Sequence, residues 1–460
     1  MKEQTFDLVV IGSGTGLDVA NACASRGLKV AIVEEGAMGG TCLNRGCIPS
    51  KMYILCADVA EEIRGAKRFG ITAKITKIDY ASIVKRVRGV VDGESMDIES
   101  AFKKIDNPKL FKAHTKFIGV KKLLVGKDVV LRAEKFLIAA GARTTIPPIP
   151  GLDKVPFLTS ETALSLKKQP KVLTILGGGY IAAELAHFFG ALGTKVSIVQ
   201  RNVLLLPRED REVAEKFTDL FGKKYNVLTG HDVLKVELTG KAYSVTVQAK
   251  EGKDGKKKTL KSDALLVATG ITPNSDSLEV TKTGLKPNAR GFIPANEFLE
   301  TSVPGIFTLG DIHGKYVFKH SANHEAKYAF NNILNPDKMI AVDYTAMPHA
   351  IFTSPQIAGV GFTEQELEES KAVYASVKWP YIRSGMGEAI LDRDGFVKFL
   401  YEPHSLKILG CHIIGTHAST LIHEVLVAMK HGGGTLKSIS DTVHIHPALS
   451  EVVQRAANKA

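Results

Sequence analysis

Two cysteines near the N-terminus stand in a setting that favours redox chemistry. The segment GGTCLNRGCIPSK, residues 39–51, carries thiols at Cys42 and Cys47. Their spacing differs from the Cys-x-x-Cys of thioredoxin, and no matching Cys or His pair follows to complete a zinc site. We expect both to lie at the opening of a helix, where a thiol has a lowered pKa and reacts as a thiolate. The other three cysteines are expected to be buried as small apolar side chains: Cys23, Cys56 and Cys411.

The end of the chain carries a candidate acid–base pair. His446 precedes Glu451 by five residues in the segment HPALSE. A carboxylate at this spacing can orient an imidazole and raise its pKa towards the working range. The two thiols strengthen the assignment of His446 and Glu451 as an acid–base pair, because thiol–disulfide exchange needs a group that protonates the leaving sulfur.

Two glycine-rich loops would position these groups. The apolar run 6–11 ends in Gly12, Gly14 and Gly16, and the apolar run 172–176 ends in Gly177 and Gly179. Each loop opens an expected helix that leads to a second strand, residues 29–33 and 195–199. The sequence thus contains two βαβ units, and the glycines of each loop let its backbone approach a pyrophosphate at a helix N-terminus. The sequence therefore predicts two dinucleotide-binding domains.

The residue that ends each second strand bears on the choice of nucleotide. Glu34 ends the first, where a carboxylate can accept hydrogen bonds from an adenosine ribose. Gln200 ends the second and is followed by Arg201, with Arg208 further on. A neutral side chain beside arginines suits a 2′-phosphate, so NADPH is favoured over NADH. The alternative is that both arginines are solvated loop charges.

In this order the motifs resemble the FAD-dependent pyridine nucleotide–disulfide oxidoreductases, the family of dihydrolipoamide dehydrogenase, glutathione reductase, mycothione reductase and mercuric reductase. The resemblance covers essentially the whole chain. It rests on residues 12–16, 42–51, 139–141, 177–182 with Glu184, 268–270, 310–311 and 446–451.

The resemblance implies an α/β fold with two Rossmann-like dinucleotide-binding domains and a C-terminal α+β dimerisation domain. The FAD-binding domain would be discontinuous and comprise residues 1–148 and 272–340. The NAD(P)-binding domain would span 149–271 and the dimerisation domain 341–460, so the active unit would be a homodimer.

Roles for individual residues follow from the same resemblance. Cys47 would lie next to the flavin and form the charge-transfer thiolate, and Cys42 would exchange with the substrate. His446, held by Glu451, would act as acid–base residue in the other subunit's site. FAD would be held by Gly12, Gly14, Gly16, Glu34, Gly40, Thr41, Lys51, Gly141 and Asp311. NAD(P) would be held by Gly177, Gly179, Tyr180, Ile181, Glu184, Gln200, Arg201 and Gly270. Lys51 and Glu184 would pair beside the isoalloxazine ring, with Tyr180 as a gate to the nicotinamide pocket.

The substrate stays open among related activities. The segments GGTCLNRGCIPSK and HIHPALSE look most like dihydrolipoamide dehydrogenase, which is the leading expectation. Residues 319–326, together with Met52 and residues 57–60, are similar to mycothione reductase. The alternative is therefore an NADPH-dependent reductase of a low-molecular-weight disulfide such as mycothione or glutathione disulfide. Hypotheses of another class are a quinone diaphorase with incidental thiols, or a docking subunit of a 2-oxoacid dehydrogenase assembly on an acyltransferase core.

Composition narrows the remaining possibilities. The 460 residues are 44% hydrophobic and 23% charged, typical of a folded globular protein. The net charge is +12, and the Lys-rich stretch 250–261 contributes heavily but lacks interleaved aromatic residues. We interpret that stretch as a solvated hairpin tip, and expect no nucleic-acid partner and no metal site. No apolar run has the length of a membrane helix, and the N-terminus lacks a signal-peptide pattern, so a cytoplasmic location is expected.

Overall fold

The computed structural model describes residues 2–250 and 255–460. Strand β1 (Lys2–Ile11) is central to the first sheet and pairs in parallel with β2 (Val30–Glu34) and β6 (Val129–Ile138). Strands β3 (Lys109–Lys112) and β16 (Ile306–Thr308) extend the parallel part beside β2 and β6. The last four residues of β1 are all buried, as expected for a parallel strand covered on both faces. Strands β4 (Thr115–Gly119) and β5 (Lys122–Val125) add antiparallel pairs next to β6.

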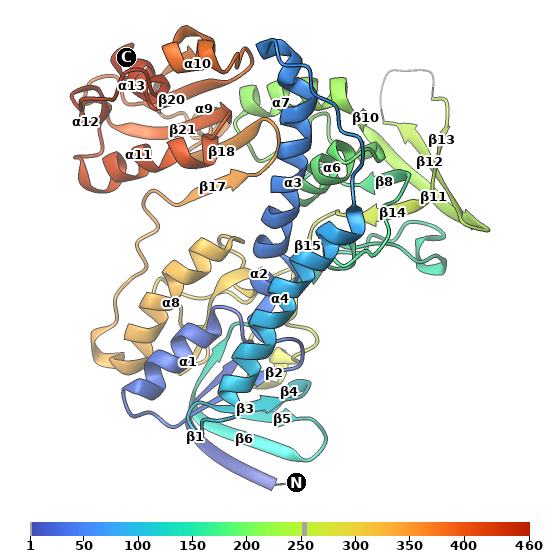
Figure 1. Ribbon diagram of the computed structural model, residues 1–460. Helices are drawn as coiled ribbons and strands as arrows, with labels where there is room; N and C mark the ends of the chain where they lie inside the picture. Colours follow the sequence, from blue (N-terminus) through green and yellow to red (C-terminus); the bar gives the residue numbers. More distant parts are fainter. Residues whose placement is uncertain (1, 251–254) are drawn as a thin grey trace.

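Helices α1 (Gly16–Ser25) and α8 (Lys319–Leu334) pack side by side against this sheet (Figure 1). Helices α2 (Gly40–Arg45), α3 (Cys47–Gly65) and α4 (Tyr80–Phe102) follow β2 in the chain. Helix α3 runs from the first sheet to helix α6 (Tyr180–Ala191) of the second dinucleotide-binding unit. It therefore connects the two predicted nucleotide sites physically.

The second unit repeats the first. Its parallel sheet has the order β10 (Asn226–Thr229), β9 (Lys195–Gln200), β8 (Val172–Leu176), β14 (Ala264–Val267). Helix α6 connects β8 to β9, and α7 (Arg211–Lys224) follows β9. An antiparallel sheet of β11 (His231–Thr239), β12 (Ala242–Ala249) and β13 (Lys258–Ser262) lies beside it. The duplicated βαβ arrangement predicted from the two glycine loops is confirmed.

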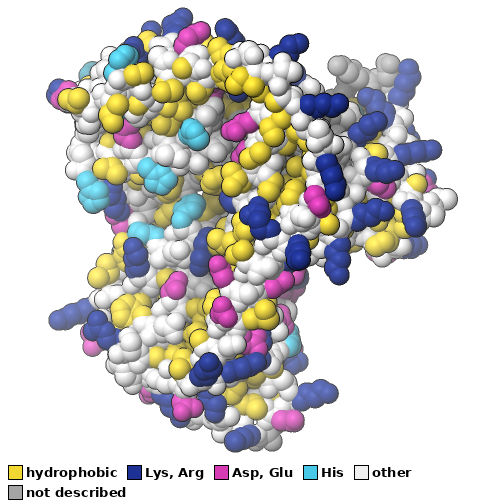
Figure 2. All heavy atoms as spheres, viewed as in Figure 1, with side chains coloured by type: hydrophobic (Ala, Val, Ile, Leu, Met, Phe, Trp, Pro, Cys, Tyr) yellow, Lys and Arg dark blue, Asp and Glu magenta, His cyan; other side chains and the backbone are white. Residues whose placement is uncertain are grey.

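The Lys-rich stretch falls between β12 and β13, whose antiparallel pairing fits a hairpin. Residues 251–254 of the expected tip lie outside the described residues. Many Lys and Arg side chains stand out over the region of β11–β13 in Figure 2. Strands β7 (Ala142–Thr144) and β15 (Ile271–Pro273) pair antiparallel where the chain passes between the two units.

The C-terminal part is an antiparallel sheet with helices on it, which confirms the α+β prediction. Its strand order is β17 (Pro348–Ile351), β18 (Gln356–Gly361), β21 (Ile408–Gly415), β20 (Phe396–Tyr401), β19 (Ala375–Pro380). Helices α11 (Ala418–His431) and α13 (Glu451–Asn458) pack on the sheet, with α12 (Lys437–Ser440) between them in sequence. Short helices complete the chain: α5 (Ser160–Ala163), α9 (Glu364–Glu369) and α10 (Gly385–Ala389).

A buried ion cluster joins the second unit to the C-terminal sheet. Lys398 of β20 is only 1% exposed, and its ammonium lies 2.9 Å from Asp210 and 2.6 Å from Glu364. Its third partner is Glu212, in the first turn of α7. Because a buried charge is tolerated only when it is paired, this cluster fixes the start of α7 against β20.

The prediction for the three remaining cysteines is correct for two. Cys23 and Cys411 are fully buried, and burial raises the pKa of Cys23 to about 11. For Cys56 the prediction is wrong, because its thiol is half-exposed and accepts a hydrogen bond from the Arg86 guanidinium at 3.2 Å. Position 56 lies outside the buried stripe of α3, which runs through residues 53, 54, 57 and 60.

Every helix in the described part of the chain is too short or too polar to cross a bilayer.

Candidate redox site

The two redox-candidate thiols meet at the junction of α2 and α3. Cys47 is the first residue of α3, as expected, but Cys42 lies inside the preceding short helix α2. The expectation of one helix is wrong because Gly46 (φ −138°, ψ −118°) leaves the helical conformation between them. The break brings the sulfur of Cys42 to the N-terminus of α3.

Hydrogen bonds polarise this pair of thiols. Cys42 accepts a hydrogen bond from the Cys47 thiol and further bonds from the backbone N–H groups of Cys47 and Ile48, and the charge of Lys319 adds to them. Together they lower the pKa of Cys42 to about 7, while the same thiol–thiol bond and burial raise the pKa of Cys47. These contacts suit Cys42 to act as the thiolate that exchanges with the substrate. The charge-transfer thiolate expected at Cys47 stays a prediction.

An ion pair connects the thiol helix to the second nucleotide loop. The Lys51 ammonium lies 2.9 and 2.8 Å from the two carboxylate oxygens of Glu184, and 4.5 Å from the ring centre of Phe352. Glu184 also accepts the backbone N–H of Phe352 at 3.0 Å. Lys51 lies one turn after Cys47, and Glu184 lies one turn after Tyr180. The pair therefore links the thiols to the start of α6, and its place beside an isoalloxazine ring stays a prediction.

The first glycine loop is built for close backbone approach. Gly12 has φ +102°, and a Cβ there would lie 2.4 Å from the carbonyl oxygen of Ala139. At the end of β2, the Glu34 carboxylate accepts the backbone N–H and the hydroxyl of Ser13 at 2.9 and 2.7 Å, and the N–H of Gly36 at 2.7 Å. Glu34 thereby holds the loop next to the N-terminus of α1, where a pyrophosphate would bind.

Asp311 supplies a test of whether the site fits FAD. It lies just after β16, at the same carboxyl edge of the sheet as the loop after β1. The Asp311 side chain is half-buried, burial raises the pKa of Asp311, and its carboxylate has no hydrogen-bond or ion-pair partner among the described residues. A half-buried carboxylate without a partner in the protein suits a ligand rich in hydroxyl groups. The residues present therefore fit FAD, with Gly40 and Thr41 opening α2 nearby and Gly141 following β6.

The second loop has the same construction. Gly177 has φ +110°, and a Cβ there would lie 2.2 Å from the carbonyl oxygen of Ala268. Gln200 is buried at the end of β9, whereas Arg201 is exposed. Within residues 2–250 and 255–460, Arg201 makes no hydrogen bond or ion pair, so its guanidinium can receive an anion. The other predicted contacts lie around this loop: Gly179, the partly exposed Ile181, and Gly270 after β14.

Tyr180 has partners that sequence reasoning missed. Its hydroxyl donates a 2.6 Å hydrogen bond to Glu209, and its ring stacks on Phe318 and His349 at centroid distances of 5.8 and 6.4 Å. His349 binds the second carboxylate oxygen of Glu209 at 2.8 Å. No local pattern marks Glu209 or His349, because they are 140 residues apart in sequence.

His446 and Glu451 are paired as expected. The imidazole Nδ1 lies 3.1 Å from both Glu451 oxygens, and Glu451 also accepts from the Arg455 guanidinium at 3.2 Å. The hydrogen bond to His446 leads the contacts that lower the pKa of Glu451. The His446 side chain is 71% exposed on the protomer surface, and its neighbour Ile445 is also exposed. An exposed imidazole and apolar side chain suit a surface that meets a second subunit.

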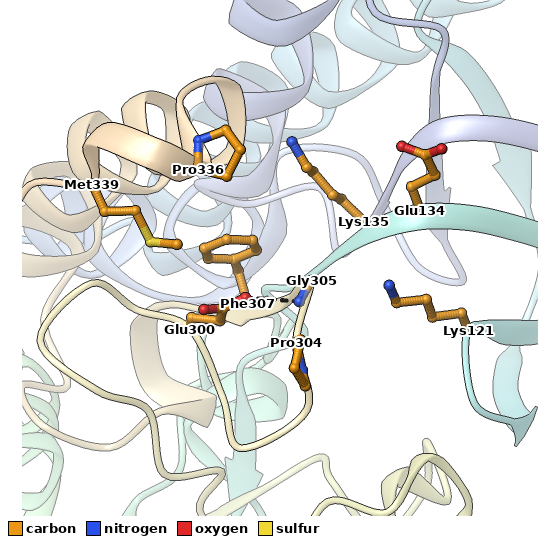
Figure 3. Close-up of a pocket in the computed structure, with 9 residues that line it drawn as sticks. All are labelled: Lys121, Glu134, Lys135, Glu300, Pro304, Gly305, Phe307, Pro336 and Met339. Carbon is orange, nitrogen blue, oxygen red and sulfur yellow. Dashed lines mark hydrogen bonds between the residues drawn. The ribbon is translucent and has the colours of Figure 1, made fainter.

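The hollow drawn in Figure 3 is a different feature. This cavity of about 450 Å³ is lined by Glu134 and Lys135 of β6, Lys121, Phe307 and Met339 among others. It lies at the amino-terminal end of β16, whereas dinucleotides bind at the carboxyl ends of parallel strands. It is therefore not the predicted FAD site.

Comparison with known proteins agrees with this geometry. Residues 6–326 match the family described as pyridine nucleotide-disulphide oxidoreductase, and residues 347–457 match its dimerisation domain. Mycothione reductase of Mycobacterium tuberculosis is 37% identical over 98% of this chain and 99% of its own length. Dihydrolipoyl dehydrogenase of Chlamydia pneumoniae is 35% identical over 98% of this chain and 95% of its own length. The HOCl-induced flavoprotein disulfide reductase RclA of Escherichia coli, solved as a Cu(II) complex, has a TM-score of 0.86 at 27% identity and 99% coverage of both chains. The chain therefore belongs to the pyridine nucleotide–disulphide oxidoreductases, flavoenzymes that use FAD and NAD(P)H, and its dimerisation domain supports a homodimer.

Proposed function

We propose that this enzyme uses NADPH to reduce a low-molecular-weight disulfide through the Cys42–Cys47 pair. The observation that carries the proposal is the neutral, buried Gln200 beside the exposed, unpaired Arg201, in the part of the chain that the structure describes. A carboxylate at position 200 would repel a 2′-phosphate, whereas a free guanidinium can bind one with a charge-assisted fork. The likeness to mycothione reductase supports this choice.

The residues have distinct roles in the proposed reaction. FAD held by the first glycine loop and Asp311 would supply the two-electron chemistry that connects NADPH oxidation to reduction of the Cys42–Cys47 disulfide. The Cys42 thiolate then attacks one sulfur of the substrate, forming a mixed disulfide and releasing the first product thiolate, which takes a proton from His446 of a second copy. His446, now neutral, accepts the proton of Cys47, whose thiolate attacks the sulfur of Cys42 and restores the protein disulfide. The second product leaves as a thiolate and takes that proton from His446. Glu451 orients His446, and Tyr180 shields the flavin until the nicotinamide ring arrives.

Dihydrolipoamide oxidation is the second candidate, supported by the residue 39–51 segment and by the likeness to dihydrolipoyl dehydrogenase. In that case the chain would dock on an acyltransferase core. We propose a cytoplasmic location for either reaction, where reduced nicotinamide nucleotides are supplied. A quinone diaphorase with incidental thiols is the third candidate. It would keep full quinone activity in the Cys42→Ser/Cys47→Ser double variant.

Steady-state turnover of the purified holoenzyme separates these candidates. The proposal predicts weak turnover of lipoamide, clear preference for NADPH, and turnover of mycothione or glutathione disulfide. Arg201→Ala should weaken NADPH use at least tenfold and spare NADH, because one charge-assisted contact contributes about 1.5 kcal/mol or more. Arg393→Ala, another exposed arginine, is the matched control. Strong lipoamide turnover with NADH would overturn the proposal in favour of dihydrolipoamide dehydrogenase.

A further inference from the structure

The buried carboxylate of Glu209 binds the hydroxyl of Tyr180, the residue that follows the second glycine loop. Glu209 is 1% exposed and has one oxygen on the Tyr180 hydroxyl and the other on the His349 imidazole, at 2.6 and 2.8 Å. Both distances are those of strong, charge-assisted hydrogen bonds. The Tyr180 ring also stacks on both Phe318 and His349, and these two rings stack on each other at a centroid distance of 6.3 Å.

The three polar partners come from separate elements. Tyr180 opens α6 directly after the second glycine loop, Glu209 lies in the segment before α7, and His349 lies on β17 of the C-terminal sheet. The next residue after Glu209 is Asp210, which Lys398 of β20 anchors at 2.9 Å. Glu209 therefore has little freedom to follow Tyr180 if the ring moves.

Electrostatic attraction between Glu209 and His349 stabilises their contacts with Tyr180. Burial alone would raise the pKa of Glu209, but His349 and the Tyr180 hydroxyl outweigh burial and hold that pKa below its usual range. Burial would lower the pKa of His349, and the Glu209 carboxylate raises it instead. The charged or titratable groups that also act on the three are Arg208, His412 of β21, Glu366 of α9 and His320 of α8. Each of the two groups therefore favours the charged form of the other.

We propose that Glu209 and His349 form a latch that holds Tyr180 in its resting position. The nicotinamide ring must break the Tyr180–Glu209 bond to reach its pocket, so a C-terminal-domain residue regulates nucleotide binding in the second unit. Glu209 and His349 act as positioning residues. The inference rests on the shielding role proposed above for Tyr180.

Binding of oxidised NADP⁺ to the holoenzyme, measured by calorimetry, tests the latch without turnover. Tyr180→Phe keeps the ring but removes the bond that binding must break. Its affinity for NADP⁺ should rise roughly tenfold, which is about 1.4 kcal/mol and within the range of hydrogen bonds to charged groups. Glu209→Gln keeps the shape with a neutral acceptor and should raise the affinity about threefold, since neutral hydrogen bonds are roughly half as strong.

A double variant and a control variant show whether the two single changes act through the same hydrogen bond. The Tyr180→Phe/Glu209→Gln double variant should bind like Tyr180→Phe alone, because both changes remove one bond. Glu364→Gln weakens the Lys398 cluster at the same interface without touching Tyr180, and should leave the affinity unchanged. If Glu209→Gln does not fold, His349→Phe, which keeps the stacked ring, carries the same test.

The failures are distinguishable. Unchanged affinity in Tyr180→Phe would overturn the claim that NADP⁺ binding breaks the Tyr180–Glu209 bond, and with it the latch, while the ring that this variant keeps would still shield the flavin. A tighter Tyr180→Phe beside an unchanged Glu209→Gln, or equal tightening by Glu364→Gln, would overturn the latch alone.

Discussion

Replacing Cys47 with alanine should make Cys42 a much weaker nucleophile at neutral pH. The Cys47 thiol is the first of the groups that lower the pKa of Cys42 from 9.0 to about 7. A thiol with pKa 7 is about half ionised at pH 7, and one with pKa 9 about 1% ionised, a ratio of about fifty. Because the backbone N–H groups and Lys319 remain in the variant, we expect roughly a tenfold fall in reactivity.

The assay is alkylation of the holoenzyme by iodoacetamide, with the labelled cysteine identified by mass spectrometry. Wild-type enzyme is first reduced by two electrons without oxygen, whereas the variant needs no reduction. Since a lowered thiol pKa means that thiolate forms as pH rises through about 7, the wild-type rate at Cys42 should have its midpoint there. In Cys47→Ala the midpoint should move towards 9.0, the ordinary value.

Cys56 provides an internal control, because its half-exposed thiol is bonded to Arg86 and not to the redox pair. Its labelling should be the same in both proteins. Lys319→Gln should shift the Cys42 midpoint in the same direction as Cys47→Ala, but less. Equal Cys42 rates and midpoints in wild type and Cys47→Ala would refute the reasoning.

Three other changes test separate parts of the account. Glu184→Gln removes the charged partner of Lys51 and should slow flavin reduction by NADPH about tenfold in stopped-flow measurements. The reason is that losing one partner of a half-buried ion pair costs about 1–2 kcal/mol. An unchanged rate would restrict the pair to a structural role. His446→Ala should depress disulfide turnover at least 100-fold, as expected for loss of an acid–base group, and leave flavin reduction unchanged; equal slowing of both steps would contradict the assignment. Lys398→Met should leave Asp210 buried without its cation and destabilise the fold by about 3 kcal/mol, which would lower the midpoint of thermal unfolding. An unchanged midpoint would show that the ion cluster contributes little to the stability of the fold.

Local sequence patterns were enough to predict the nucleotide-binding units. Gly12 and Gly177 each end an apolar run, and their backbone geometry leaves no room for a side chain. Strand, loop and helix are therefore encoded within about thirty consecutive residues. The Lys51–Glu184 pair was expected only by resemblance, since the two residues lie 133 positions apart.

Contacts between distant segments were beyond prediction. Nothing in the sequence around Glu209 sets it apart from the neighbouring charged residues, and only the fold brings it to Tyr180 and His349. The helix break at Gly46 was missed as well, because an isolated glycine in a helical pattern has no unique meaning.

The most direct test of the central claim is an anaerobic titration of the holoenzyme with NADPH, followed by absorbance. Wild type is expected to take up four electrons per FAD, two in the flavin and two in the Cys42–Cys47 disulfide, and to pass through a long-wavelength charge-transfer band. Cys47→Ser should take up two electrons and lack the band. Uptake of only two electrons by wild type, with a spectrum that Cys47→Ser reproduces, would contradict the claim that electrons pass through these thiols.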